Sequence, residues 1–527
     1  MFLRKDKYIY LIAAAALLLY VPLFLFRDFT PVNELKYINI ADHMLKSGDW
    51  IKLQFNGALY TDKPPLYFWI VALIRLVTGK YTLFSIGFII CILPAIVTGL
   101  DIYRFLGENN YSRKRACTVV LILYTILYFA GSVLVIRMDI LMTMFIVKAL
   151  ISFYNKVEKN TGNPYIPYIY MGFGFLVKGL AAVFIPISVI IVYLFLSKQI
   201  YKIKELKFGR GIIIIILFAL IWLIPLAVSL GVNSTINELL LKQTMNRAVN
   251  TSVHKRPVYY YLVSLFPNLF PWTLFFFASL VTLIFKIKEQ GKFIIFILCW
   301  FIMPFIIFSL VSSKLNIYLI PAYGAIAVIT ERILNSKYVK IRTAAGILTS
   351  IPYFLFLAAA FAAKKQLTEM DPFLFRLVLF YGAFSLLTAI AGIYFLIKGK
   401  VYNYVCNIVI NMIILLTVLT VSAPIVNEYI GFTKFAGIIK AEREKDNSLK
   451  IFGYKEGEAD RMAYIVNDDT ISNIENPDEM KQIINKENVI ILLQNKDIKD
   501  LPENYELIYS NSKFIIIKYI RKEGRNE

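Results

Sequence analysis

Long apolar stretches alternate with short polar segments along the first 430 residues. A stretch of about 18 or more apolar residues can cross the hydrocarbon layer of a bilayer as a helix. The stretches that approach or exceed this length are 8–26, 82–103, 116–136, 169–196, 211–231, 259–285, 293–312, 341–363, 374–397 and 401–423. With two further helices, from Arg137 and from Lys314, and a hairpin of two helices across 165–197, the pattern predicts about thirteen spans of ~20 residues each.

The pattern changes near residue 430, where polar and charged residues become frequent. Short apolar runs typical of β-strands follow at 449–453, 462–466, 489–493, 505–509 and 514–519. Between them, residues 476–488 predict a helix with acidic residues in its first turn. We therefore expect a transmembrane domain over residues 1–430 and a small soluble α/β domain over residues 431–527.

The segment between the first two apolar stretches, residues 27–80, is long and polar. Within it, residues 33–46 place Leu35, Ile38 and Ala41 on one face of a helix and charged residues on the others. This pattern predicts an amphipathic helix that lies along the membrane surface.

The net charge of +22 and the mean hydropathy of +0.64 fit a membrane protein better than a nucleic-acid-binding protein. The basic residues form short clusters in alternate loops, as the positive-inside rule requires. The rule places the N-terminus in the cytoplasm, and both the 27–80 loop and the C-terminal domain outside it, in a prokaryotic cytoplasmic membrane. We expect the lipid bilayer as a partner, no nucleic acid, and a monomeric protein. The four cysteines all lie in or beside apolar stretches and predict no disulfide framework.

Ionisable residues at a membrane boundary are costly and are therefore candidate functional residues. Arg137 and Asp139 lead directly into an apolar helix, and Lys178 interrupts the 165–197 hairpin with no acid nearby in sequence. Asp62 and Lys63 precede a double proline, which stiffens the backbone at this point. The structural alternatives are a surface ion pair for Asp62 and Lys63 and a lysine that extends its amine to the membrane surface for Lys314. No nucleotide-binding loop is present, so the sequence gives no sign of ATP-driven chemistry.

Several segments resemble, in order, motifs of the bacterial membrane glycosyltransferases that use polyprenyl-phosphate sugars. These are the lipid A aminoarabinose transferases and their relatives among the protein O-mannosyltransferases. The matching segments are NELKYINIADHMLKSGDW (33–50), NGALYTDKPPLYFWIVAL (56–73), RMDILMTMF (137–145), GFLVKGLAAVFIP (174–186), RPVYYYLVSLFPNLFPW (256–272) and SSKLNIYLIPAY (312–323). The resemblance spans roughly residues 5–430, and the KPP loop and the K-x-x-x-Y-L-x-P segment are specific in combination.

This resemblance implies a polytopic α-helical membrane protein with the GT-C fold. It also implies an inverting glycosyltransferase that moves a sugar from a polyprenyl-phosphate carrier to an acceptor on the outer face of the membrane. The acceptor can be lipid A, a protein or a cell-surface glycan, and the sequence leaves both sugar and acceptor open.

The resemblance also implies the catalytic residues. The acidic pair of the family's first outer loop aligns with Asn33 and Glu34, so an amide stands at the usual catalytic aspartate. Because an amide cannot act as a base at neutral pH, we expect Glu34 to take this role. Alternatively, Asn33 orients the acceptor while another acid serves, or the enzyme is impaired. Asp139 matches the family's second aspartate.

Contacts to the carrier phosphate or the sugar are expected from Tyr60, Lys63, Arg137, Lys178, Arg247, Lys314 and Tyr318. In the aminoarabinose transferases a Glu at the position of Asp62 helps to hold a metal with a histidine of a later loop. Thr244 stands where that histidine is expected. No cofactor is therefore certain, and a divalent metal stays possible with Asp62 as its candidate ligand. A different class, a transporter or flippase of lipid-linked sugars, would favour charges at mid-membrane and internal repeats.

Overall fold

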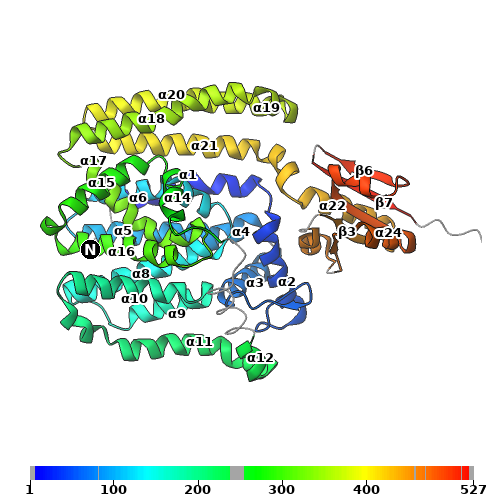
Figure 1. Ribbon diagram of the computed structural model, residues 1–527, viewed down its shortest axis with the longest axis horizontal. Coiled ribbons are helices and arrows are strands. Elements are labelled where there is room, and N and C mark those ends of the chain that lie inside the picture. Colours follow the sequence, from blue (N-terminus) through cyan, green and yellow to red (C-terminus); the bar gives the residue numbers. More distant parts are fainter. Residues whose placement is uncertain are drawn as a thin grey trace, which may run out of the picture. The chain divides into compact units, whose positions relative to one another are not determined.

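The computed structural model describes residues 6–80, 82–237, 255–455, 459–468, 470–511 and 513–520. Most of these residues are helical (Figure 1). By their internal contacts they form two compact units. The first comprises residues 1–25, 61–67 and 84–420, and the second comprises 26–60, 68–83 and 421–527.

The first unit contains the long apolar helices. In the described residues, nine helices are long and apolar enough to cross a membrane, or ten if the bent pair of α6 and α7 is one span. Three shorter apolar helices of this unit, α9, α10 and α15, accompany them. The elements of this part of the chain are α1 (Lys7–Phe26), α4 (Leu83–Gly87), η2 (Phe88–Ile92), α5 (Leu93–Gly107), α6 (Arg113–Thr125), α7 (Leu127–Val133), α8 (Met138–Lys159), α9 (Ile166–Lys178), α10 (Ala181–Leu196), η3 (Ile200–Leu206), α11 (Phe208–Leu230), α12 (Val232–Ile236), α14 (Tyr260–Asn268), α15 (Thr273–Phe285), η5 (Ile287–Glu289), α16 (Lys292–Leu310), η6 (Asn316–Ala322), α17 (Tyr323–Leu334), α18 (Val339–Ala362), α19 (Lys364–Met370), α20 (Pro372–Ile397) and α21 (Val401–Ile430).

The apolar stretches of the sequence correspond to these helices, but several stretches are broken. The 116–136 stretch bends by 72° between α6 and α7. The 165–197 hairpin is present as α9 and α10, which are shorter than the ~20 residues expected of a span. These breaks explain why the described residues contain fewer full-length spans than the expected number of about thirteen.

The helices of the hairpin pack against their neighbours in sequence. Figure 1 shows α8, α9, α10 and α11 side by side, and α8 and α9 share one of the most extensive contacts in the unit. Close approach depends on small residues: a side chain at Gly172 of α9 would run into the ring of Phe218 in α11. This packing brings the end of α9 to the start of α8.

The second unit combines the first loop of the chain with its C-terminal part. Its elements are η1 (Pro31–Leu35), a π-helical turn, α2 (Lys36–Ser47), β1 (Gln54–Phe55), β2 (Ala58–Leu59), α3 (Leu66–Thr78), α22 (Thr433–Lys445), β3 (Lys450–Tyr454), η7 (Ala459–Met462), α23 (Ala463–Val466), β4 (Ser472–Ile474), α24 (Pro477–Lys486), β5 (Val489–Gln494), η8 (Asn495–Asp500), β6 (Glu506–Ser510) and β7 (Phe514–Tyr519). Two short strands, β1 and β2, form a hairpin in the loop.

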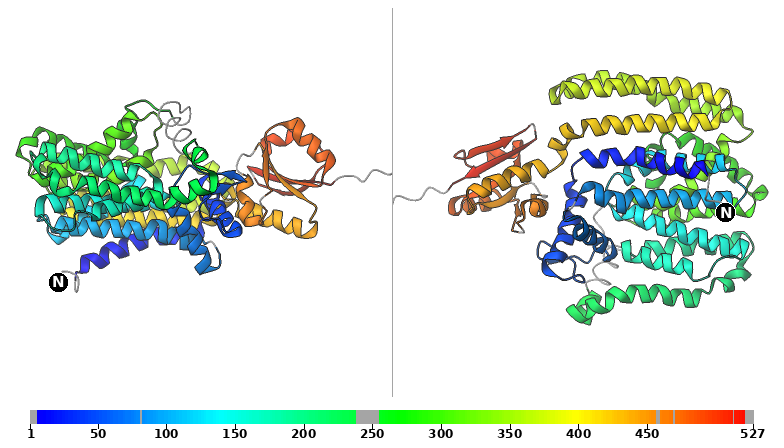
Figure 2. Two further views of the ribbon diagram at one scale, coloured as in Figure 1. Left: turned by 90° about the horizontal axis from the view of Figure 1, so that it is seen from below. Right: turned by 180° about the vertical axis from the view of Figure 1, so that it is seen from behind.

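The C-terminal sheet has the strand order β4-β3-β5-β7-β6, with β3 parallel to β4 and β5, and β7 antiparallel to β5 and β6. Alternate residues of β5 face opposite sides of the sheet, as the period of a strand requires. Ile490 and Leu492 pack with α22, η7 and α23, whereas Ile491 and Leu493 pack with α24. Figure 2 shows helices on both faces of this sheet.

Four of the five predicted strands are confirmed, as is the helix over 476–488. The strand predicted at 462–466 is wrong: these residues are helical, and Met462, Ala463 and Val466 are the buried positions. Three or four residues separate the buried positions 462/463 and 466, which is helical spacing. The predicted amphipathic helix is present from Lys36, but Leu35 packs into the core of the C-terminal domain.

Candidate active site

Three of the predicted site residues meet where α8 begins and α9 ends. Asp139 lies in the first turn of α8 and is only 2% exposed. One of its carboxylate oxygens accepts a hydrogen bond from the Lys178 amine, and the other accepts one from Arg137 Nε at 3.2 Å. Lys178 therefore has a carboxylate partner, which comes from the neighbouring helix.

Local sequence explains the placement of both charges. Helix α9 ends at Lys178 because Gly179 adopts a φ of +92°, which residues with a side chain rarely adopt. The basic Lys178 in the last turn of α9 and the acidic Asp139 in the first turn of α8 are both favoured by the helix dipoles. The cluster thus brings two cations to one carboxylate.

Tyr318 belongs to the same site. The Lys178 amine lies 5.3 Å from the centroid of the Tyr318 ring, within the range of a cation–π interaction. Tyr318 lies in η6, which packs against α8. The start of α8 and η6, which are far apart in sequence, therefore meet at Lys178 of α9.

Lys314 precedes η6 and is almost completely buried. Its amine donates to the carbonyl oxygens of Val311 and of Arg256, the latter at 3.1 Å. The same strand-like pairing continues from Arg256 N–H to the Ser312 carbonyl at 3.2 Å. Lys314 thus connects the segment before η6 to the segment before α14. The acceptors of its buried ammonium group are neutral carbonyl groups.

A cavity of about 460 Å³ adjoins the cluster, with Arg137 in its wall. The other lining residues come from α7 and the residues around it, from α14 and from η6: Leu127, Tyr128, Gly131, Ser132, Val135, Pro267, Asn268 and Ile317. The wall is mostly apolar, so the cavity suits an apolar group that ends in an anion.

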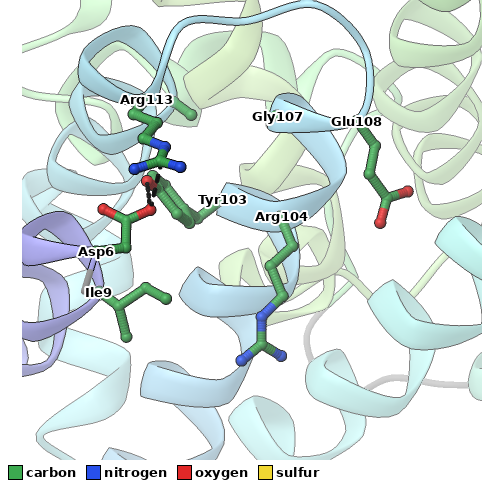
Figure 3. Close-up of a pocket in the computed structure, with 8 residues that line it drawn as sticks. Asp6, Ile9, Tyr103, Arg104, Gly107, Glu108 and Arg113 are labelled. Carbon is green, nitrogen blue, oxygen red and sulfur yellow. Dashed lines mark hydrogen bonds and ion pairs between the residues drawn. The ribbon is translucent and has the colours of Figure 1, made fainter. Parts of the chain in front are cut away.

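A second cavity, of about 280 Å³, lies between the starts of α1 and α6 and the end of α5 (Figure 3). There the Tyr103 hydroxyl donates to Asp6 at 2.7 Å, and Arg113 forms an ion pair with the same carboxylate at 3.6 Å. The end of α5 also pairs with the end of α8, from Glu108 to Lys159 at 2.9 Å. At ~1.5 Å per residue, the two ends of α8 are about 30 Å apart, so this cavity is remote from Asp139.

The KPP loop lies in the first unit, directly before α3. Pro64 and Pro65 are buried, Lys63 is half-buried and Asp62 is exposed. Lys63 as a phosphate contact and Asp62 as a metal ligand stay predictions. In the described residues, no group of three or more His, Cys, Asp or Glu side chains is placed to hold a metal.

The acid of the first loop lies in the second unit and has a basic partner. Arg27 donates to both oxygens of Glu34, at 2.9 and 2.6 Å, and the Thr30 N–H donates to one of them at 2.7 Å. The Glu34 side chain is fully buried. Its role as a base therefore requires Arg27 to release one oxygen to the acceptor, and this role stays a prediction. Asn33 is half-buried beside it.

Sequence analysis missed Arg27. The available signal was a basic residue directly after the first apolar stretch, seven positions before the acid. Tyr60 also lies in this unit, where the Lys36 amine is 4.9 Å from its ring centroid. Arg247 and Thr244 lie outside the described residues.

Comparison with known proteins supplies the context for this geometry. Residues 62–222 match the family described as dolichyl-phosphate-mannose-protein mannosyltransferase. The chain is 29% identical over 310 residues to an uncharacterized protein of Aquifex aeolicus, over 58% of this chain and 60% of that one. It is 27% identical over 310 residues to the undecaprenyl phosphate-alpha-4-amino-4-deoxy-L-arabinose arabinosyl transferase of Aeromonas hydrophila, over 56% of this chain and 54% of that one. The matched part thus covers little more than half the length of these relatives.

The whole fold has a counterpart among solved structures. The crystal structure of ArnT from Cupriavidus metallidurans bound to undecaprenyl phosphate superimposes with a TM-score of 0.78 at 16% sequence identity. The match covers 98% of this chain and 99% of that one. These similarities confirm the resemblance expected from the motifs. They also confirm the predicted fold class, a polytopic helical membrane protein with a small C-terminal domain.

Proposed function

We propose that this chain, a multi-pass membrane protein with the fold of ArnT, is a glycosyltransferase that uses a sugar linked to a polyprenyl phosphate. The observation that carries the proposal is the buried cluster of Asp139, Lys178 and Arg137 beside an apolar cavity. An apolar wall that ends at two cations fits an isoprenoid chain that ends in a phosphate.

The cluster suits the chemistry of this transfer. An acceptor hydroxyl attacks the anomeric carbon, a bond to the acceptor oxygen forms, and the bond between the anomeric carbon and the phosphate oxygen breaks. The bonding electrons leave with the carrier phosphate, whose growing negative charge is stabilised by cations that are already in place. Lys178 and Arg137 would supply these cations, with Asp139 as the group that orients both. The acceptor proton would pass to Glu34 once Arg27 releases one oxygen, and the anomeric configuration would invert.

The relatives support the nature of the donor. One is named as a transferase that uses an undecaprenyl-phosphate sugar, and the ArnT structure contains undecaprenyl phosphate. We infer the same carrier class for this chain, with the reaction on the outer face of a prokaryotic cytoplasmic membrane. Lipid A, a protein hydroxyl and a cell-wall glycan are the acceptor classes to be compared.

Release of free polyprenyl phosphate tests the proposal. Purified full-length protein in lipid nanodiscs is incubated with a polyprenyl-phosphate sugar, with and without a lipid, peptide or glycan acceptor. We expect acceptor-dependent release of the carrier phosphate. Movement of the intact sugar-lipid between the leaflets of a vesicle without such release would contradict the proposal and favour a flippase.

Lys63 provides a prediction about the carrier. Replacement of Lys63 by Gln removes one cation from the stiff KPP loop and is expected to raise the KM for the carrier-linked sugar. A hydrogen bond to a charged group is worth about 1.5–3 kcal/mol, which corresponds to roughly 10–100-fold in KM. Lys80→Gln, which removes an exposed cation further along the same segment, is the matched control. An equal KM in the two variants would contradict a contact between Lys63 and the carrier phosphate.

A further inference from the structure

The C-terminal domain and the first loop of the chain share one hydrophobic core. Leu35 of the loop is fully buried in a cluster that contains Phe432, Phe435 and Ile439 of the C-terminal part. The same cluster includes Ile516 of β7 in the C-terminal sheet. Leu35 directly follows Glu34, so the residue next to the candidate base is an integral part of the C-terminal core.

The loop also caps the first helix of the C-terminal domain. Helix α22 has no side-chain cap of its own at Phe432. Instead, Asp28 accepts a hydrogen bond from the Thr433 N–H at 2.9 Å and another from the Thr433 hydroxyl. A carboxylate at this position satisfies an otherwise unpaired N–H and interacts favourably with the helix dipole. The cap comes from a residue 405 positions earlier in the chain.

Gly431 makes this contact possible. It lies between α21 and α22, and a Cβ atom at this position would collide with the Asp28 carboxylate. The neighbouring Asn427 accepts from the Asp28 N–H at 2.9 Å and donates to the Phe26 carbonyl, also at 2.9 Å. The Asn427 side chain at the end of α21 therefore holds the loop at its beginning.

A further contact holds the loop beyond Glu34. The Asn39 side chain in α2 donates to the Arg461 carbonyl at 3.2 Å and accepts from the Tyr464 N–H at 3.1 Å. The amino group of the Asn39 side chain is thus hydrogen-bonded to η7, and its oxygen is hydrogen-bonded to α23. Asn56, further along the loop, donates to the Asp460 carboxylate.

From these contacts we propose that the C-terminal domain is a positioning element for transfer, which fixes the turn that carries Asn33 and Glu34. The anchors at Asp28, Leu35 and Asn39 lie on both sides of this turn. An independent accessory domain on a linker would supply its own helix cap and its own core. Here the loop completes both the helix cap and the core. A structural change in the domain therefore alters the position of the candidate base. This inference rests on the proposed glycosyltransferase function.

A pair of glycine substitutions tests the inference in the full-length protein. Gly431→Ala forces a methyl group against Asp28, whereas Gly437→Ala places the same group in open space within α22. Amide hydrogen exchange of residues 33–47 reports the order of the loop, and the rate of carrier-phosphate release reports transfer. In Gly431→Ala we expect exchange to be about ten-fold faster, because the loss of a hydrogen bond to a charged group costs at least about that factor. A displacement of the base by about 1 Å can lower kcat by up to roughly 100-fold, and we expect the KM for the carrier to stay unchanged. Gly437→Ala should match the wild type in all three measurements.

Asn39→Ala is the milder second variant, in case Gly431→Ala does not fold, and it should show the same pattern to a smaller degree. Unchanged exchange in the folded variants would overturn the anchoring itself, whether or not the protein transfers sugar. Faster exchange with an unchanged kcat would overturn the positioning role. A wild-type protein without turnover would overturn the proposed function and, with it, the positioning role.

Discussion

Asp139→Asn is expected to reduce sugar transfer by a factor of about 100 to 1,000 and to lower the melting temperature of the protein. The substitution leaves the amine of Lys178 and the guanidinium of Arg137 without the carboxylate that they share. Removal of one partner from a buried ion pair costs about 3–5 kcal/mol. Loss of a preorganised group that stabilises charge in the transition state typically costs two to three orders of magnitude in kcat. Carrier-phosphate release and thermal unfolding in detergent measure the two effects.

The matched control is an aspartate of α5 whose lysine partner lies on α8. Asp101 forms an ion pair with Lys148 of α8 at 2.7 Å, and both side chains are partly exposed. Asp101→Asn removes this pair without changing the cluster at the start of α8, so transfer should stay at the wild-type rate. The double variant Asp139→Asn/Lys178→Met also removes the amine that has lost its carboxylate. It should therefore recover part of the stability that Asp139→Asn alone loses. If it also recovered turnover, Asp139 and Lys178 would have a structural role only.

The members of this cluster were predictable from the sequence, but their pairing was not. Arg137, Asp139 and Lys178 stand out because charges next to apolar helices are costly. Lys178 has no acid nearby in sequence, and its partner lies 39 residues away. The pairing depends on the packing of α9 against α8, and the sequence pattern of either helix alone contains no information about that contact.

The first loop shows a second limit of sequence patterns. The helical periodicity of residues 33–46 predicts an apolar face, and that face exists, but periodicity does not identify what covers it. Leu35 packs into a core formed some 400 residues later in the chain, because Phe432 and Phe435 present a matching apolar surface. Arg27 was missed for a similar reason, since it contacts Glu34 only after the chain turns at Pro31.

Arg27→Gln is expected to destabilise the second unit by about 3–5 kcal/mol, because it leaves the fully buried Glu34 carboxylate without its cation. The measurement is the melting temperature together with hydrogen exchange of residues 33–47. Lys46→Gln is the matched control. Lys46 pairs with Asp42 at 3.1 Å on the same loop, but its side chain is 39% exposed, and such pairs contribute at most about 1 kcal/mol.

The double variant Arg27→Gln/Glu34→Gln separates the two roles of Glu34. It replaces a buried ion pair by two amides that can bond to each other, so most of the lost stability should return. Turnover should not return, because an amide at position 34 cannot accept the acceptor proton. A double variant that regained both stability and turnover would show that Glu34 only holds Arg27. The proton would then have to pass to another acid, with Asn33 left to orient the acceptor.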